Sequence, residues 1–184
     1  MKLLVVVDYQ KDFVDGALGF PGAETLDAGI AAKIRAYSQR GDFIVQTMDT
    51  HQADYLSTRE GLHLPVPHCI AGTDGWQTYG ETAQAIAKIE NNPRFCRIDK
   101  ATFGVHPQDM LALLSQIGSS PITEIELVGL VSNICVISNL CVFQGAFPLA
   151  QMVIDPQLIA SFDPSTHEAV LAVMRGLQVR LEGV

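Results

Sequence analysis

Two kinds of hydrophobic pattern alternate along the chain. Short apolar runs rich in β-branched residues, such as residues 3–7, have no polar face, which is typical of strands buried in a parallel sheet. Longer segments place apolar residues at helical spacing, and residues 24–39 are followed by Gly41, where a helix-ending glycine belongs. We predict strands at 3–7, 43–48, 95–98, 125–129, 149–154 and 178–181, and helices at 24–39, 80–89, 106–117, 134–144 and 165–175.

The alternation of strands and helices predicts an α/β fold. Buried strands joined by helices form a parallel sheet with right-handed crossovers, covered on both faces. We therefore expect a single domain over residues 1–184, with three α/β/α layers and a mostly parallel, roughly six-stranded, Rossmann-like sheet. Residues 49–75 are predicted to be a long irregular segment. In such sheets ligands bind outside the carboxyl ends of the strands.

Reactive side chains follow several of the predicted strands. Asp8, Asp49 and Lys100 each stand at a strand end, and Cys135 is expected about two residues into the helix after the fourth strand. At that position the helix dipole favours a thiolate, and free N–H groups can stabilise an oxyanion. Cys135 therefore suits a nucleophile, with a carboxylate and a lysine nearby. The alternative is that Cys135 is a small buried apolar residue, and spacing alone does not decide between the two.

A second group of residues suits a metal ion. Asp49 and His51 are two positions apart on an extended stretch, so both side chains point the same way. His68 lies further along the irregular segment, and two imidazoles with a carboxylate leave coordination positions open. Glu60 is a candidate fourth ligand, ranked above His63, and the alternative is a set of solvated loop side chains. The other histidines are expected to cap helices or lie at the surface: His106 and His167.

Charge and composition limit the binding partners and the cellular location that we expect. The formal net charge of -8 argues against binding to nucleic acid or to an anionic membrane surface. The first apolar run ends at Asp8, too early for a signal peptide, and there is no apolar stretch of the ~20 residues that a membrane span needs. The four cysteines have no CxxC spacing, so we expect free thiols and a cytoplasmic location.

Five segments, in order, resemble the isochorismatase-like cysteine hydrolases, and within them the nicotinamidase/pyrazinamidase branch. They are residues 8–13 (DYQKDF), 49–51 (DTH), 67–75 (PHCIAGTDG), 100–103 (KATF) and 129–136 (GLVSNICV). Each motif alone is modest evidence. Their order, and their position at one edge of the predicted sheet, favour the catalytic interpretation of the cysteine.

The resemblance implies a mechanism for the first group. Asp8 would be the general base, Cys135 the nucleophile that forms a thioester, and Lys100 the residue that steadies the charges. Backbone N–H groups of Val131 and Cys135 would form the oxyanion hole. The family often has a cis peptide in this turn, which corresponds to the bond between Leu130 and Val131.

The resemblance also implies a substrate and a cofactor. The reaction would be hydrolysis of nicotinamide to nicotinate and ammonia, as in NAD salvage, with the substrate ring contacted by Phe13, Phe103 and Trp76. Asp49, His51, His68 and Glu60, or water in place of Glu60, would hold a divalent metal, with zinc ranked before iron or manganese. Homo-oligomers are expected. The alternatives are a hydrolase of another small amide, tested by substrate specificity, and an inactive binding protein of this fold.

The chain departs from the family pattern at four positions. Asn133 replaces an Asp and Ser132 a Thr in the nucleophile turn. Pro65 stands where relatives often have an aromatic residue, and Tyr55 where some have an extra metal-binding histidine. These changes affect the expected substrate more than the expected chemistry.

Overall fold

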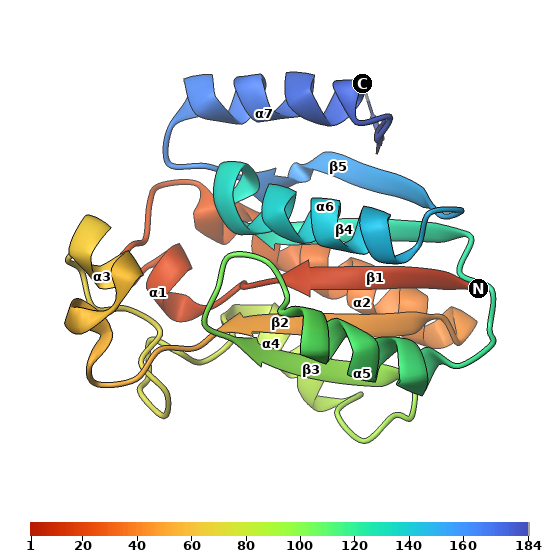
Figure 1. Ribbon diagram of the computed structural model, residues 1–184, viewed down its shortest axis with the longest axis horizontal. Helices are drawn as coiled ribbons and strands as arrows, with labels where there is room; N and C mark the ends of the chain where they lie inside the picture. Colours follow the sequence, from red (N-terminus) through yellow and green to blue (C-terminus); the bar gives the residue numbers. More distant parts are fainter. Residues whose placement is uncertain (184) are drawn as a thin grey trace.

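Six parallel strands form one sheet in the computed structural model, which describes residues 1–183 (Figure 1). The strand order is β3-β2-β1-β4-β5-β6, so the chain starts in the middle of the sheet, builds one half, and crosses over to build the other. Every neighbouring pair is parallel, as the buried apolar runs predicted. The strands are β1 (Lys2–Val7), β2 (Phe43–Asp49), β3 (Phe95–Lys100), β4 (Glu124–Leu130), β5 (Gln151–Ala160) and β6 (Arg180–Leu181).

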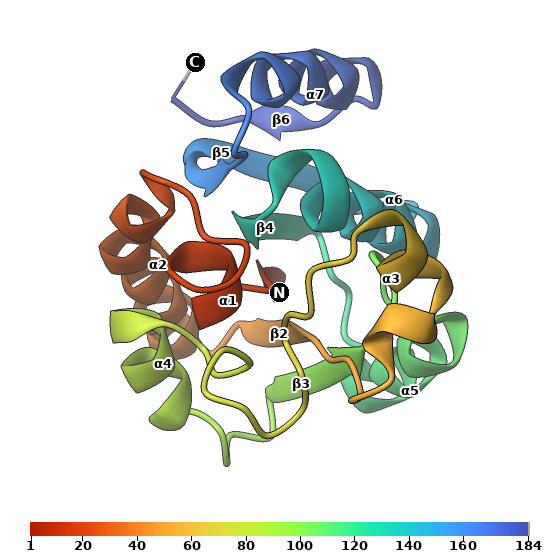
Figure 2. The same ribbon diagram turned by 90° about the vertical axis from the view of Figure 1, so that its left-hand side faces the viewer.

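Helices cover both faces of the sheet, as Figure 2 shows looking along the strands. One face carries α5, α6 and α7, and the other carries α1, α2 and α4. Among residues 1–183 no helix is both long and apolar enough to cross a bilayer. The α-helices are α1 (Lys11–Val14), α2 (Asp27–Arg40), α3 (Arg59–His63), α4 (Gly80–Ala87), α5 (Pro107–Ile117), α6 (Ile137–Ala146) and α7 (Pro164–Gly176).

The pleat of β1 explains the two hydrophobic layers. Leu3 and Val5 face the layer that contains α5 and α6, while Leu4 and Val6 face the layer that contains α2. All four side chains are completely buried. A central strand buried on both faces needs a continuous apolar run, and this is why its sequence carries no polar alternation.

The predicted fold is confirmed, with local differences. The helix predicted at 24–39 begins as a 3-10 turn, Ala23–Leu26, before α2. The segment 49–75, predicted to be irregular, contains a short 3-10 turn and α3. The fifth strand begins after the predicted residue 149 and runs to Ala160, because it resumes pairing with the end of β4 beyond a register shift.

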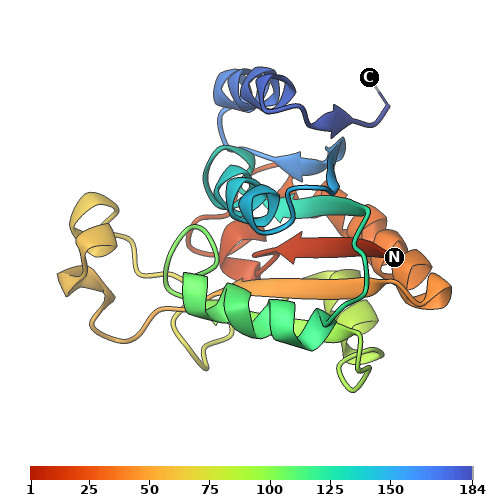
Figure 3. The same cartoon turned by 45° about the vertical axis from the view of Figure 1, so that its right-hand side comes forward.

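The carboxyl ends of the strands meet at one edge of the sheet, and the segment that contains α3 extends beyond this edge (Figure 3). Asp49 and Lys100 are direct register partners at the ends of β2 and β3. Gly129, near the end of β4, has a φ of +114°, and a Cβ there would lie 2.0 Å from the carbonyl oxygen of Val7. Only glycine allows β4 to approach β1 so closely, which brings the turn after β4 next to Asp8.

Candidate active site and metal centre

The nucleophile turn joins β4 to α6. The Leu130–Val131 peptide bond is cis, as the family resemblance implied. Ser132–Val136 then forms a π-helical turn, in which the N–H of Val136 donates to the carbonyl oxygen of Val131 at 3.1 Å. Cys135 therefore lies in this turn, ahead of α6, and the prediction of an α-helix starting at residue 134 was wrong at its first turn. The wider turn leaves Val131 and Cys135 together in the lining of the cleft.

The nucleophile turn brings Cys135 close to Lys100 and Asp8. Lys100 Nζ lies 2.6 Å from Asp8 Oδ2 and 3.9 Å from Cys135 Sγ. Thr47 on β2 donates a hydrogen bond from Oγ1 to the other carboxylate oxygen of Asp8 at 2.7 Å. All of these side chains are buried, so the charges interact with little screening by water.

Burial controls the ionisation of this cluster. It raises the pKa of the Cys135 thiol well above its ordinary value, and the Asp8 carboxylate raises it further, while Lys100 opposes both. Burial likewise raises the pKa of Asp8 against the opposing charge of Lys100. Burial alone would lower the pKa of Lys100, but Asp8 and Cys135 raise it overall. The raised pKa favours the protonated thiol, so a base must remove that proton before attack.

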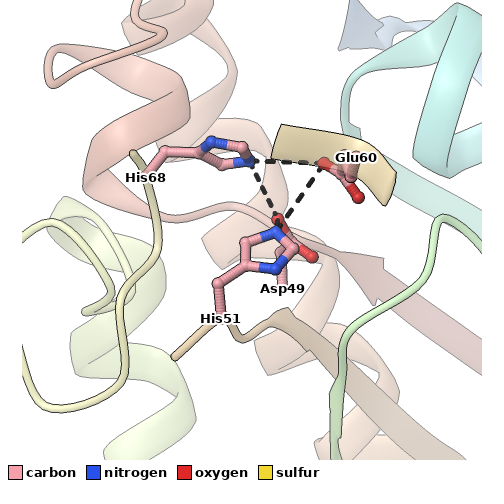
Figure 4. A group of neighbouring side chains, drawn as sticks. All are labelled: Asp49, His51, Glu60 and His68. Atoms are coloured by element: carbon pink, nitrogen blue, oxygen red, sulfur yellow. Dashed lines mark hydrogen bonds and ion pairs between the residues drawn. The ribbon is translucent and has the colours of Figure 1, made fainter. Parts of the chain in front are cut away.

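Four further side chains converge beside this cluster (Figure 4). Asp49 Oδ2 lies 3.0 Å from His51 Nε2 and 3.3 Å from His68 Nε2. Glu60 Oε1 lies 3.7 Å from each of the two imidazole nitrogens. One possible ligand atom from each residue is within 4.8 Å of all the others. Glu60 belongs to α3 rather than to a loop, and the helix directs its carboxylate towards the histidines.

The donor set fits a single divalent ion. Ligands held at ~2.1 Å by a tetrahedral metal lie about 3.4 Å from one another, close to the separations found here. His68 Nδ1 donates to the carbonyl oxygen of Val66 at 2.8 Å, which leaves its Nε2 lone pair free to bind a metal. Tyr55 packs against both rings, with centroids 4.6 Å from His51 and 5.0 Å from His68, and holds their orientation.

The charges of this group also suit a cation. Burial alone would raise the pKa of Asp49, but hydrogen bonds from His51 and His68 and the charge of Lys100 lower it overall. Burial and the neighbouring Asp49 raise the pKa of Glu60. Two carboxylates held this close repel each other unless positive charge lies between them.

A cleft of about 1100 Å³ connects the two clusters. Cys135 and the four metal-site side chains line it, together with Phe13 and Phe103. Trp76, expected to contact the substrate, is not in the lining; its Nε1 donates to Thr50 Oγ1 at 2.9 Å, and Arg97 stacks on its ring at 4.5 Å. The structure thus brings together every site residue predicted from the sequence except Trp76.

The remaining predicted residues have other surroundings. His63 lines the cleft but is outside the group that could hold a metal. His106 caps α5, as predicted. His167 was expected to cap a helix or lie at the surface, but its Nδ1 is 3.0 Å from the buried Ser132 Oγ in the nucleophile turn. The Oδ1 atom of Asn133 is buried without a hydrogen-bond partner among the described residues, so this amide oxygen orients nothing there.

Two buried polar residues were missed by the sequence analysis. Thr47 bonds the general-base candidate Asp8, and Gln10 bonds the backbone of Asp49. The sequence did offer a signal for both. Gln10 is a polar residue two positions after Asp8, and Thr47 is a polar residue inside a predicted buried strand, two positions before Asp49.

Comparisons with known proteins identify the family of the chain. The family model described as "Isochorismatase domain" matches residues 2–181. The uncharacterized isochorismatase family protein PncA of Bacillus subtilis is 28% identical over 176 residues, which cover 93% of this chain and 92% of that protein.

Solved structures share the fold across nearly the full length. The nicotinamidase/pyrazinamidase PncA of Bacillus subtilis superposes with a TM-score of 0.87 at 27% identity, covering 98% of this chain and 99% of that one. A pyrazinamidase of Pyrococcus horikoshii, solved in complex with zinc, has the same fold, with a TM-score of 0.81 at 22% identity over 98% of this chain and 97% of that one. The resemblance inferred from the motifs is confirmed, and the chain belongs to the isochorismatase family of hydrolases.

Proposed function

We propose that this protein is a metal-dependent cysteine amidohydrolase that converts nicotinamide to nicotinate and ammonia. The observation that carries the proposal is one cleft lined by both Cys135 and a metal-binding group, with Lys100 Nζ only 3.8 Å from Asp49 Oδ1. The names of the similar nicotinamidases support the choice of substrate. The proposal treats the chain as one catalytic domain, since a single sheet carries both clusters.

The first half-reaction begins with proton transfer. Asp8 removes the proton of the Cys135 thiol, and Sγ forms a bond to the amide carbon of the substrate. The carbonyl oxygen becomes an oxyanion, to which the N–H groups of Val131 and Cys135 donate hydrogen bonds. Protonated Asp8 then gives its proton to the amide nitrogen, the C–N bond breaks, and ammonia leaves a thioester on Cys135.

The second half-reaction restores the thiol. Asp8 takes a proton from water, whose oxygen attacks the thioester carbon, and the C–S bond then breaks. Asp8 returns the proton to Sγ, and the product leaves as a carboxylic acid, which releases its proton to water to become the carboxylate. Lys100 stays protonated throughout, because its neighbours raise its pKa, and its charge stabilises Asp8 and the departing thiolate.

The residues that would hold the metal are Asp49, His51, His68 and Glu60. When bound, such an ion supplies a Lewis acid beside the cleft, able to bind the ring nitrogen of a pyridine amide. Zinc, iron and manganese all accept two imidazoles with carboxylates. Phe13, in edge contact with His68 at 5.5 Å, would form one wall for the substrate ring, and Phe103 would contact the ring from the opening of the cleft.

The proposal is tested by ammonia release from nicotinamide, measured on purified protein before chelation, after chelation, and after metal is restored. We expect turnover that disappears with the metal and returns with it. The Cys135→Ala variant should fold and bind metal but release no ammonia, and ammonia release by that variant would exclude Cys135 as the nucleophile. No turnover of nicotinamide, with Cys135-dependent turnover of another small amide, would change the substrate assignment, whereas no turnover of any small amide by the metal-loaded protein would favour an inactive binding protein.

A further inference from the structure

The side chain of Gln10 takes the place of a missing strand beside Asp49. Strand β1 ends at Val7, and Asp8, with a φ of +45°, turns the chain away. The last backbone bond of this ladder runs from the N–H of Asp8 to the carbonyl oxygen of Thr47 at 3.2 Å. Strand β2 continues for two more residues, and alternate residues of a strand bond to the same side. The backbone of Asp49 therefore faces a position that β1 has left.

Gln10 fills this position with three hydrogen bonds from its side chain. Its Oε1 accepts from the N–H of Asp49 at 2.7 Å, and its Nε2 donates to the carbonyl oxygen of Asp49 at 2.9 Å. Nε2 also donates to the carbonyl oxygen of Trp76 at 2.9 Å. The side chain is completely buried, so water does not compete for these bonds.

The next residue, Thr50, is held by β3. The N–H of Thr50 donates to the carbonyl oxygen of Lys100 at 2.7 Å. With Gln10 on one side and β3 on the other, the backbone from Asp49 to His51 is fixed at the point where two of the candidate metal ligands leave it. We propose that Gln10 is a positioning residue that sets the affinity of the metal centre. This inference rests on the metal centre of the proposed function, but not on nicotinamide as the substrate.

The bonding pattern requires a glutamine. A carboxamide offers a donor and an acceptor side by side, matching the N–H and carbonyl of one extended residue. A glutamate would direct a carboxylate oxygen at the carbonyl of Asp49, and an asparagine is one methylene too short. Residues around a metal site that orient its ligands typically change metal affinity by about 10- to 100-fold when they are removed.

A matched control, Gln46, lies on the same strand as Asp49. Gln46 is 2% exposed and donates from Nε2 to Thr78 Oγ1 at 2.7 Å and to Met48 Sδ at 3.1 Å, and neither partner belongs to the metal site. Gln10→Met and Gln46→Met each keep a side chain of similar size and remove a buried carboxamide. A general loss of packing would affect both variants alike, whereas positioning of Asp49 affects only the first.

The experiment measures the Kd of Zn²⁺ for wild type and both variants by competition with a chromophoric chelator, with urea unfolding of the metal-free proteins in parallel. We expect Gln10→Met to weaken zinc binding about 10- to 100-fold, and Gln46→Met to leave it within about threefold of wild type at a similar loss of stability. Unchanged binding by Gln10→Met, an equal loss in Gln46→Met, or no zinc binding by wild type would each overturn the proposal.

A measurement on the wild-type protein covers the case in which Gln10→Met does not fold. Amide hydrogen exchange should show the N–H of Asp49 protected to the same degree as the N–H groups inside β2. Exchange of Asp49 at the rate of an exposed loop would overturn the inference. Neither measurement uses nicotinamide, so failure of the substrate assignment and failure of this positioning role are distinguishable.

Discussion

Replacing Lys100 by methionine tests the electrostatics of the catalytic cluster. Lys100 Nζ and Asp8 Oδ2 are 2.6 Å apart, and both side chains have 0% exposure. The substitution keeps the volume of the side chain but leaves Asp8 as a buried carboxylate without a counter-charge. Such a group becomes neutral, and stability falls by the free energy needed to protonate it.

The loss of stability depends on how far the pH lies above the ordinary pKa of Asp8. Each pH unit corresponds to about 1.4 kcal/mol, and the ordinary pKa of an aspartate is 3.8. Holding Asp8 neutral in the folded state therefore costs up to about 4 kcal/mol at pH 7 and less than about 2 kcal/mol at pH 5. The sign is fixed because a raised carboxyl pKa destabilises the folded state only above the unfolded pKa. Lys100→Met should thus lose stability relative to wild type as pH rises from 5 to 7.

The assay is urea unfolding of metal-free protein at pH 5 and pH 7. Wild type, Lys100→Met, Asp8→Asn and the double variant form a double-mutant cycle. In the Asp8→Asn background, removal of Lys100 should cost less, because the nearest remaining carboxylate, Asp49, is 3.8 Å from Nζ and keeps its hydrogen bonds from His51 and His68. Equal costs of Lys100→Met at both pH values, or additive effects in the cycle, would refute the reasoning.

Three further predictions follow from other contacts. Thr47→Val removes the 2.7 Å hydrogen bond to Asp8, so the pKa of Asp8 should rise further. We expect kcat/KM to fall by roughly tenfold near neutral pH and the acid limb of its pH profile to move to higher pH. An unchanged pH profile would contradict this. His51→Ala should lose bound metal while the fold persists, and full metal content by elemental analysis would count against the site. Partial burial alone would raise the pKa of Glu124, but ion pairs with Lys2 and Arg180 lower it below 4.5. These ion pairs therefore stabilise the folded state above that pH, and this stabilisation is lost as pH falls. Glu124→Gln should therefore cost less than about 1 kcal/mol at pH 7 and nothing in acid, as measured by urea unfolding.

The sequence determined the architecture, because strands and helices are specified by hydrophobic patterns within short stretches of the chain. The run at residues 3–7 could be buried only as a central strand, and the helical spacing in α2 left one apolar face to cover the sheet. Once a parallel sheet was inferred, its carboxyl edge gathered Asp8, Asp49 and Lys100 without any knowledge of distances. The motifs then distinguished Cys135 from an ordinary buried cysteine.

The tertiary structure decided what depends on contacts between distant segments. Burial beside Asp8 raises the pKa of the Cys135 thiol, and no local pattern reveals that effect. Trp76 lies outside the cleft lining, and the guanidinium of Arg97, 21 positions away in the sequence, stacks on its ring. Gln10 became a partner of Asp49, 39 residues away, only because β1 ends two residues earlier than β2 in the shared register. Hydrophobic periodicity fixes which residues are buried, but hydrogen bonds and charges across the chain fix which chemical state each buried group adopts.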